Sequence, residues 1–192
     1  MDTWRLFIAV EVPPSVKDAL VAVQQQLQRG SPPVKWVAPA AMHLTLQFLG
    51  ATDTQLVTPI GAALRQALAG QPACELRLGP PGVFPNARRP SVLWVGIDGA
   101  TSALEQMQRS IAAALRPLGF PVEARPFRAH LTIGRVRRDA SAAQQAHLGS
   151  MLAHVSPPPA LSWRVTEVIL FQSELLREGP RYTARDAVQL IG

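Results

Sequence analysis

The sequence His43-Leu44-Thr45-Leu46 recurs later in the chain as His130-Leu131-Thr132-Ile133. In each copy polar and apolar residues alternate, which is the pattern of a half-buried β-strand. Successive side chains of a strand point to opposite faces, so the histidine and the threonine share one face and the aliphatic residues share the other. Each tetrad therefore presents one imidazole and one hydroxyl on the same side of a predicted strand.

A predicted helix precedes each tetrad. The first helix begins at Pro13-Pro14-Ser15 and ends at Gly30, and the second begins near Thr101 and ends at Gly119. Two units of this kind indicate an internal duplication. Because the strands are joined by short turns and interleaved with helices, we predict an α+β fold, bilobal and duplicated, with two mainly antiparallel sheets flanking a central cleft and helices on the outside. Residues 1–192 should form a single two-lobed domain.

Further segments follow the same plan. Alternation and turn residues predict the remaining elements from their periodicity. Strands are expected over residues 4–12, around Trp36, and over 43–49, 74–78, 91–97, 127–136, 165–171 and 182–190, helices over 53–68 and 140–155, and a loop over 79–90.

The composition restricts the class of protein. A chain of 192 residues buries enough surface for a core without disulfides or a structural metal. No window of about 18 residues is continuously apolar, and the N-terminal residues lack the basic region and cleavage site of a signal peptide. We expect a cytoplasmic monomer without a membrane partner. Cys74 is the only cysteine, and its strand-like surroundings indicate a core residue rather than a nucleophile.

The net charge of +6 arises from 17 arginines and only two lysines. The arginines crowd the two middle regions of the chain, as in Arg88-Arg89 and Arg137-Arg138. Arginine binds phosphate oxygens through a planar fork, so this bias favours an anionic partner such as nucleic acid or a nucleotide. Codon composition alone explains the same bias equally well.

Two imidazoles and two hydroxyls facing one cleft suit in-line cleavage of a phosphodiester. One group must take a proton from the attacking oxygen and another must give one to the leaving oxygen, and histidine serves in either role at neutral pH. Threonine hydroxyls and arginines then contact the non-bridging oxygens. We expect no metal and no cofactor. A lone His-x-Thr is more often a structural feature, but the duplication of the motif favours catalysis.

The motifs and their order resemble a known family, the RNA 2',3'-cyclic phosphodiesterases, formerly called 2'-5' RNA ligases, of the two-histidine phosphoesterase superfamily. Ala129 departs from this pattern, because members often carry proline before the second histidine. The resemblance covers nearly the whole chain. It rests on Lys35-Trp36-Val37-Ala38-Pro39, the run Met42 to Gly50, Phe84-Pro85, Arg89-Pro90 with Val92-Leu93-Trp94, the run Phe127 to Arg135, Leu170-Phe171-Gln172-Ser173 and Gly179-Pro180-Arg181-Tyr182.

This resemblance implies a bilobal fold with a pseudo-two-fold axis and a reaction that opens a 2',3'-cyclic phosphate at an RNA 3' end, leaving a 2'-phosphate. By analogy within the superfamily, His130 is the general base that activates water and His43 is the general acid on the 3' oxygen, although the two roles could be exchanged. Thr45 and Thr132 are expected to hold the phosphate.

Three further residues are candidates for substrate binding. Arg128 lies two residues before His130 and so shares its face, which favours a phosphate contact. Arg135 lies at an odd offset from His130 and reaches the cleft only if the strand bends at Gly134; otherwise it is an exposed arginine. Phe48 has the same offset from His43 and is either a platform for a base or an ordinary core aromatic, and Trp36 and Phe84 pose the same choice.

Alternative functions remain open at this point. Within enzymes, the chain could join RNA ends through a 2'-5' bond or hydrolyse small cyclic or 2',5'-linked nucleotides. A non-enzymatic alternative is an arginine-rich RNA-binding module on an inert duplicated fold. A pure binding module has no need of two histidines that are each paired with a threonine, so the tetrads favour the enzyme.

Overall fold

The computed structural model describes residues 2–122, 126–176 and 179–192. Its helices are α1 (Pro14–Gln28), α2 (Val57–Leu68), α3 (Thr101–Leu115) and α4 (Ala142–Leu152), with short 3-10 helices η1 (Pro39–Ala41), η2 (Thr54–Leu56) and η3 (Arg116–Leu118). Its strands are β1 (Thr3–Glu11), β2 (Val34–Trp36), β3 (His43–Asp53), β4 (Cys74–Phe84), β5 (Val92–Gly99), β6 (His130–Val136), β7 (Ser162–Val165), β8 (Glu167–Leu176) and β9 (Gly179–Gln189).

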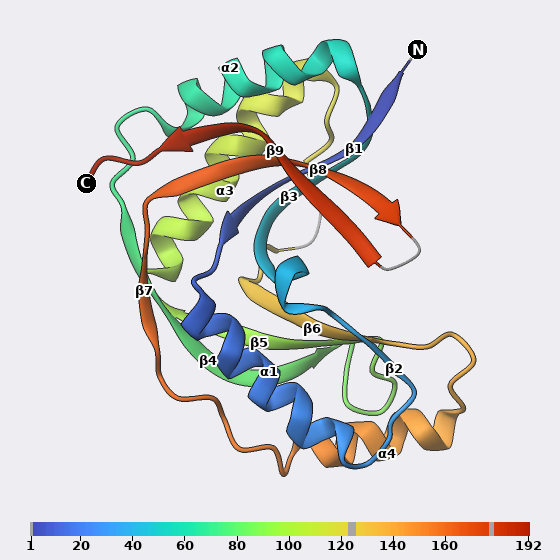
Figure 1. Cartoon of the computed structure of the whole chain (residues 1–192). Coiled ribbons are helices and arrows are strands. Elements are labelled where there is room, and N and C mark those ends of the chain that lie inside the picture. Colours follow the sequence, from blue (N-terminus) through green and yellow to red (C-terminus); the bar gives the residue numbers. More distant parts are fainter. Residues whose placement is uncertain (1, 123–125, 177–178) are drawn as a thin grey trace.

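The strands form one curled sheet of nine strands. Their order is β7-β4-β5-β6-β3-β1-β8-β9, and β2 pairs with β6 outside this path. All pairings between these strands are antiparallel. Figure 1 shows the sheet curling from β8 and β9 to β4 and β5, with α2 beside the first of these hairpins and α4 beyond the second. The α+β class predicted from the sequence is confirmed.

The two predicted sheets are joined through the strands that carry the tetrads. Within the described residues, one register pair connects the halves: Leu44 of β3 faces Leu131 of β6. Both leucines are 0% exposed and belong to the main hydrophobic core. The join therefore buries the aliphatic side of each tetrad, and the sheet is continuous where the sequence suggested a gap between two sheets.

The two halves repeat the same backbone pairing. Glu11 faces His43 and Ala9 faces Thr45, as Gly96 faces His130 and Trp94 faces Thr132. One step further along, both registers shift by one residue, so that β3 carries an extra residue at Leu46 and β6 carries one at Ile133. These are β-bulges at the last position of each tetrad, and each shifts the alternation of side chains by one.

The helices that precede the tetrads pack across the duplication. Helix α1 contacts β6, and α3 contacts β3, so each helix supports the strand of the other half. On α1, the Gln24 side-chain amide is buried and donates hydrogen bonds of 2.8 Å to the carbonyls of Val37 and Ile133. The Ile133 carbonyl, at the bulge, also accepts the backbone N–H of Val37 at 3.0 Å, so Gln24 links α1 to both segments at this point.

Several predicted boundaries were wrong, including the end of the strand expected over 43–49, which continues to Asp53 as β3. The loop expected over 79–90 begins only after Phe84, because β4 continues through Pro80 and Pro81. Proline lacks a backbone donor and is tolerated at a sheet edge, and β7 covers β4 only from Cys74 to Arg77. The prolines therefore lie where one side of β4 has no paired strand among the described residues. Strand β7 itself was not predicted, and β6 begins at His130 rather than at 127.

Candidate active site

The tetrads lie side by side at the centre of the sheet. Continuing the antiparallel register from Leu44 and Leu131 by one residue places His43 opposite Thr132 and Thr45 opposite His130. The two histidines are thus diagonal neighbours, whose separation in a sheet is roughly 7–8 Å. All four polar side chains are half-buried, on the face opposite to the buried leucines. The register thus places the four side chains on one face of the sheet, as neighbours.

The ring of His130 is fixed by its own backbone. Its Nδ1 lies 2.6 Å from the carbonyl oxygen of Arg128, which can only accept, so the neutral ring carries its hydrogen on Nδ1 and leaves Nε2 bare. Burial lowers the pKa of His130, and the charges of Arg135 and Arg128 lower it further against that backbone hydrogen bond. The imidazole is therefore neutral and unprotonated at Nε2 in the unliganded protein at neutral pH.

His43 occupies an aromatic setting. Its ring stacks on Phe7 at a centroid distance of 4.6 Å and meets the edge of Tyr182 at 5.1 Å. Burial lowers its pKa from the ordinary value of 6.5 to about 4, the charge of Lys17 acts in the same direction, and a hydrogen bond with the backbone of Ala41 opposes both. Each histidine is thus bonded to the backbone two residues before it and held neutral mainly by burial.

The bulges decide where Arg135 and Phe48 lie. A bulge lies between each histidine and the residue five positions after it, so Phe48 and Arg135 lie on the same face of the sheet as the histidines. For Arg135 the sequence analysis made this orientation depend on a bend at Gly134, and the bulge at Ile133 immediately precedes that residue. The charge of Arg135 acts on the pKa of both His130 and Tyr182, which belong to opposite halves. The Phe48 ring is 66% exposed and lies 6.3 Å from Phe7. It is not a core aromatic.

Arg128 lies over the aromatic residues beside His130. Its guanidinium carbon is 5.9 Å from the ring centre of Phe84 and 5.8 Å from that of Trp94. Both rings also approach His130, at 5.1 and 6.2 Å. Phe84 thus belongs to the site. Trp36, in contrast, packs partly buried against the core, where its ring lies against the backbone of Gly134.

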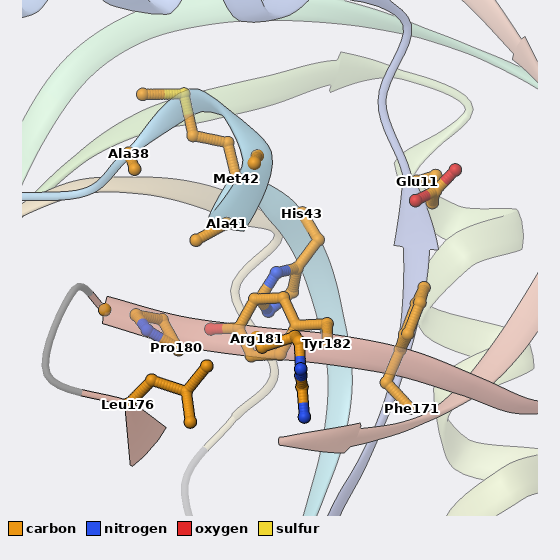
Figure 2. Close-up of a pocket in the computed structure, with 12 residues that line it drawn as sticks. Glu11, Ala38, Ala41, Met42, His43, Phe171, Leu176, Pro180, Arg181 and Tyr182 are labelled. Carbon is orange, nitrogen blue, oxygen red and sulfur yellow. The ribbon is translucent and has the colours of Figure 1, made fainter. Parts of the chain in front are cut away.

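A cavity of about 410 Å³ opens beside His43. Its walls are η1, the start of β3 and the β8–β9 hairpin, and Figure 2 shows the His43 and Tyr182 rings close together on one side of it. The lining is mostly apolar, with Met42 and Phe171 among its residues, and its charged residues are Arg181 and Glu11 at the end of β1. Such a space accommodates a nucleoside-sized group next to the imidazole.

The sequence did not identify Phe7, Trp94 or Tyr182 as site residues. Each lies on a strand outside the tetrads and reaches a histidine only through the pairing of β1, β5 and β9 with their neighbours. Tyr182 is the only tyrosine of the chain and falls within the closing motif of the family, which was the one available signal.

Among the described residues, no three histidine, cysteine or acidic side chains converge in the manner of a metal site. No helix in the described part of the chain has the length and apolar character needed to cross a membrane.

The chain has relatives of similar sequence among curated proteins. The chain is 33% identical over 186 residues to the RNA 2',3'-cyclic phosphodiesterase of Methanothermobacter thermautotrophicus, covering 97% of this chain and 98% of the relative. It is 31% identical over 178 residues to the protein of the same name from Archaeoglobus fulgidus, covering 93% and 96%.

Solved structures share the fold. A structure from Thermus thermophilus superposes with a TM-score of 0.81 at 28% identity and covers 98% of both chains. Escherichia coli LigT, solved as a complex with 3'-AMP, has a TM-score of 0.78 at 23% identity over the full length of both chains. At the level of sequence, the family model for the 2'-5' RNA ligase superfamily matches residues 12–175. The chain belongs to the 2'-5' RNA ligase superfamily.

Proposed function

We propose that the protein hydrolyses the 2',3'-cyclic phosphate at the 3' end of RNA to a 2'-phosphate. The observation that carries this proposal is the pairing of Leu44 with Leu131, because it brings the two tetrads side by side with their imidazoles and hydroxyls on one face of the sheet. The names of the relatives from Methanothermobacter thermautotrophicus and Archaeoglobus fulgidus support the substrate class. Both tetrads come from one chain, so a monomer suffices for this chemistry.

His130 is the general base. Its bare Nε2 accepts the proton of a water molecule as the water oxygen attacks phosphorus. Burial is the main cause that lowers the pKa of this ring, and the charges of Arg135 and Arg128 lower it further, so the ring is ready to accept a proton at neutral pH. The Nδ1 hydrogen bond to the Arg128 carbonyl holds the tautomer and raises the pKa, but it does not offset the effect of burial.

His43 is the general acid. When the bond between phosphorus and the 3' oxygen breaks, the protonated ring gives its proton to that oxygen. A pKa of about 4 leaves the free ring neutral, but a phosphate anion beside it favours the charged form. Substrate binding therefore favours protonation of His43, and the ring then gives this proton to the 3' oxygen. With the 5'-hydroxyl of a second RNA in place of water, the same pair in the same roles serves ligation: His130 takes the hydroxyl proton, the 5' oxygen attacks phosphorus, and His43 protonates the departing 3' oxygen, which leaves a 2'-5' bond.

The remaining residues bind the substrate. Thr45 and Thr132 donate to the non-bridging oxygens from diagonal corners of the site. Arg135 and Arg128 balance the charge of the phosphate, with Arg135 placed between His130 and Tyr182. The exposed Phe48 ring offers a face on which a base stacks. No step of this mechanism requires a metal.

Phosphorus NMR tests the proposal, because it separates cyclic, 2'- and 3'-phosphates. In the presence of chelator, the wild-type protein should convert a 2',3'-cyclic mononucleotide and a cyclic-phosphate RNA end to 2'-phosphates. His43→Ala and His130→Ala should each lose about 10²–10⁴ of the rate. His154→Ala is the matched control, since this ring is exposed and lies 3.0 Å from the Ser150 carbonyl. Undiminished turnover in either site variant, or dependence on added metal, would overturn the mechanism.

A further inference from the structure

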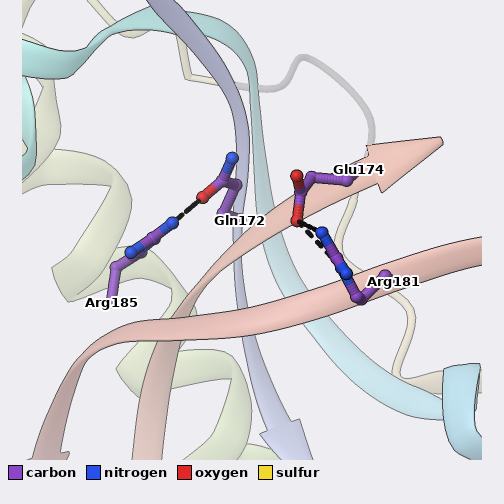
Figure 3. A network of polar contacts seen from close by, with 4 residues as sticks. All are labelled: Gln172, Glu174, Arg181 and Arg185. Atoms are coloured by element: carbon purple, nitrogen blue, oxygen red, sulfur yellow. Dashed lines mark hydrogen bonds and ion pairs between the residues drawn. The ribbon is translucent and has the colours of Figure 1, made fainter. Parts of the chain in front are cut away.

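Two groups of cations differ in whether they have partners. Those of the C-terminal hairpin and of α2 have partners: Arg65 pairs with Asp186 at 2.7 Å, and Arg181 with Glu174 at 3.1 Å. Figure 3 shows Arg181 on Glu174 and Arg185 on Gln172, and the guanidinium of Arg185 also lies 4.1 Å from the ring centre of Trp4. These cations are engaged in structure.

Within the described part of the chain, a second group of cations has no such partners, with one exception. We call it the cationic edge, and it lies where β2, β6 and the β4–β5 loop end together. Among the described residues, the one ion pair of this group joins Arg137 to Asp139 at 3.3 Å. All five side chains belong to exposed residues. The cationic edge consists of Lys35, Arg88, Arg89, Arg135 and Arg137.

The sheet register lines up three of these cations. Lys35 of β2 faces Arg135 of β6, and directly opposed residues of an antiparallel pair share a face. The backbone N–H of Arg137 donates to the Pro33 carbonyl at 2.8 Å, which continues the pairing, so Arg137 follows Arg135 on the same face at about 7 Å. Lys35, Arg135 and Arg137 therefore form a row of cations that begins at the active site and leads away from His130.

The β4–β5 loop holds the other two cations beside this row. The Asn86 side-chain oxygen accepts the backbone N–H groups of both Arg88 and Arg89 at 3.1 Å. The Val136 N–H donates to the Ser91 carbonyl at 2.9 Å, which ties the loop to the end of β6. Helix α4 supports it as well, since Gly149 lies so close to Ala87 that a Cβ there would overlap the Ala87 carbonyl oxygen.

We propose that the cationic edge binds the phosphodiester backbone of the RNA upstream of the cyclic phosphate, so that the protein prefers oligonucleotide ends to mononucleotides. This inference rests on the proposed function. With the terminal phosphate between the imidazoles, the chain must leave the site. The side toward His43 is a mostly apolar cavity, whereas the side toward His130 carries the cationic edge. A spacing of about 7 Å along the strand is comparable to that of successive phosphates in an extended chain.

The first test compares two substrates that share the same terminal nucleotide, a 2',3'-cyclic mononucleotide and a hexaribonucleotide with that end. In Lys35→Ala/Arg137→Ala and in Arg88→Ala/Arg89→Ala, we expect kcat/KM on the hexamer to fall roughly tenfold. Turnover of the mononucleotide should stay unchanged, because these side chains lie beyond the terminal phosphate. The control is Arg109→Ala, an exposed arginine on α3 that should alter neither substrate. Equal losses on both substrates, or no loss on the hexamer, would overturn the proposal.

A binding measurement separates this proposal from the catalytic one. Fluorescence anisotropy of a labelled hexamer with a 2'-phosphate end is recorded in the inactive His43→Ala/His130→Ala protein at several salt concentrations. Each phosphate contact with a single strand adds about 0.7 to the slope of log affinity against log salt. Adding Lys35→Ala/Arg137→Ala should lower the slope by about 1.4. An unchanged slope would contradict RNA binding by the cationic edge. A wild-type protein that is inactive on both substrates would contradict only the proposed catalytic function.

Discussion

The half around His43 and the half around His130 share a backbone and differ in their side chains. Both strands pair with their neighbours in the same register, carry a bulge at the same tetrad position, and show the same succession of half-buried, buried and exposed residues. Around His43 the neighbours are Phe7, Tyr182 and a mostly apolar cavity. Around His130 they are the rings of Phe84 and Trp94 with Arg128 over them, and the charge of Arg135 also acts on the imidazole. The two halves thus share a backbone geometry, and we propose that the different side chains around it give the two histidines their different roles.

The largest effect should come from removing either imidazole. His43→Ala and His130→Ala should each reduce kcat by about 10³-fold, and the double variant should be little slower than either single one, because groups that act as a pair are not additive. Single-turnover rates on a cyclic mononucleotide give the comparison. Additive losses in the double variant would show that the two rings act in separate steps or at separate sites.

Thr45 and Thr132 test the symmetry of phosphate binding. Thr45→Val and Thr132→Val keep the shape of the side chain and remove a hydroxyl donor, so each should cost about 10²-fold in kcat/KM. Similar losses mean that both halves hold the phosphate. A loss in one variant alone would confine phosphate binding to one half, and Thr183→Val on β9 serves as the control.

The residues just after the bulges should respond in opposite directions. At Gly134 an added Cβ would meet Val34 at 2.7 Å and Trp36 at 3.2 Å, so Gly134→Ala should lower the free energy of unfolding by about 1–3 kcal/mol. The equivalent residue, Gln47, has a buried side-chain oxygen without a hydrogen-bond partner among the described residues. Gln47→Met should therefore be neutral or stabilise by about 1 kcal/mol. Urea denaturation measures both, and destabilisation by Gln47→Met would contradict the comparison.

The smallest effect should be on the pKa of each histidine. Arg135→Met should raise the pKa of His130 and leave that of His43 unchanged, whereas Lys17→Met should do the reverse. Titration of the imidazole proton signals reports both values. If the pKa of both histidines changed in either variant, the two halves would not be electrostatically distinct.

The same shifts set the pH dependence. Both folded pKa values lie below 6.5, so the maximum of kcat/KM, which reports the free enzyme, should lie on the acid side of 6.5. The unfolded chain binds more protons than the folded one between about 4 and 6.5, so the free energy of unfolding should rise with pH across this window. His43→Gln should flatten that rise, and an unchanged slope would contradict the buried neutral ring.

The sequence predicted the fold class and the faces of the tetrads because alternation is a local property of a strand. It left Arg135 and Phe48 undecided because their orientation depends on bulges at Ile133 and Leu46, and those arise from pairing with β5 and β1. Tyr182 escaped notice for a similar reason, since it reaches His43 from β9. Pairing between distant segments, rather than local pattern, decides these positions.

The central claim is that the two imidazoles act on one phosphate. Proton NMR of the four histidines, assigned with His43→Gln and His130→Gln, tests it during titration with a 2'-mononucleotide. We predict that the His43 and His130 signals shift together with a single dissociation constant and that both pKa values rise, while His147 and His154 stay unchanged. A shift of one ring alone, or two different dissociation constants, would contradict the account.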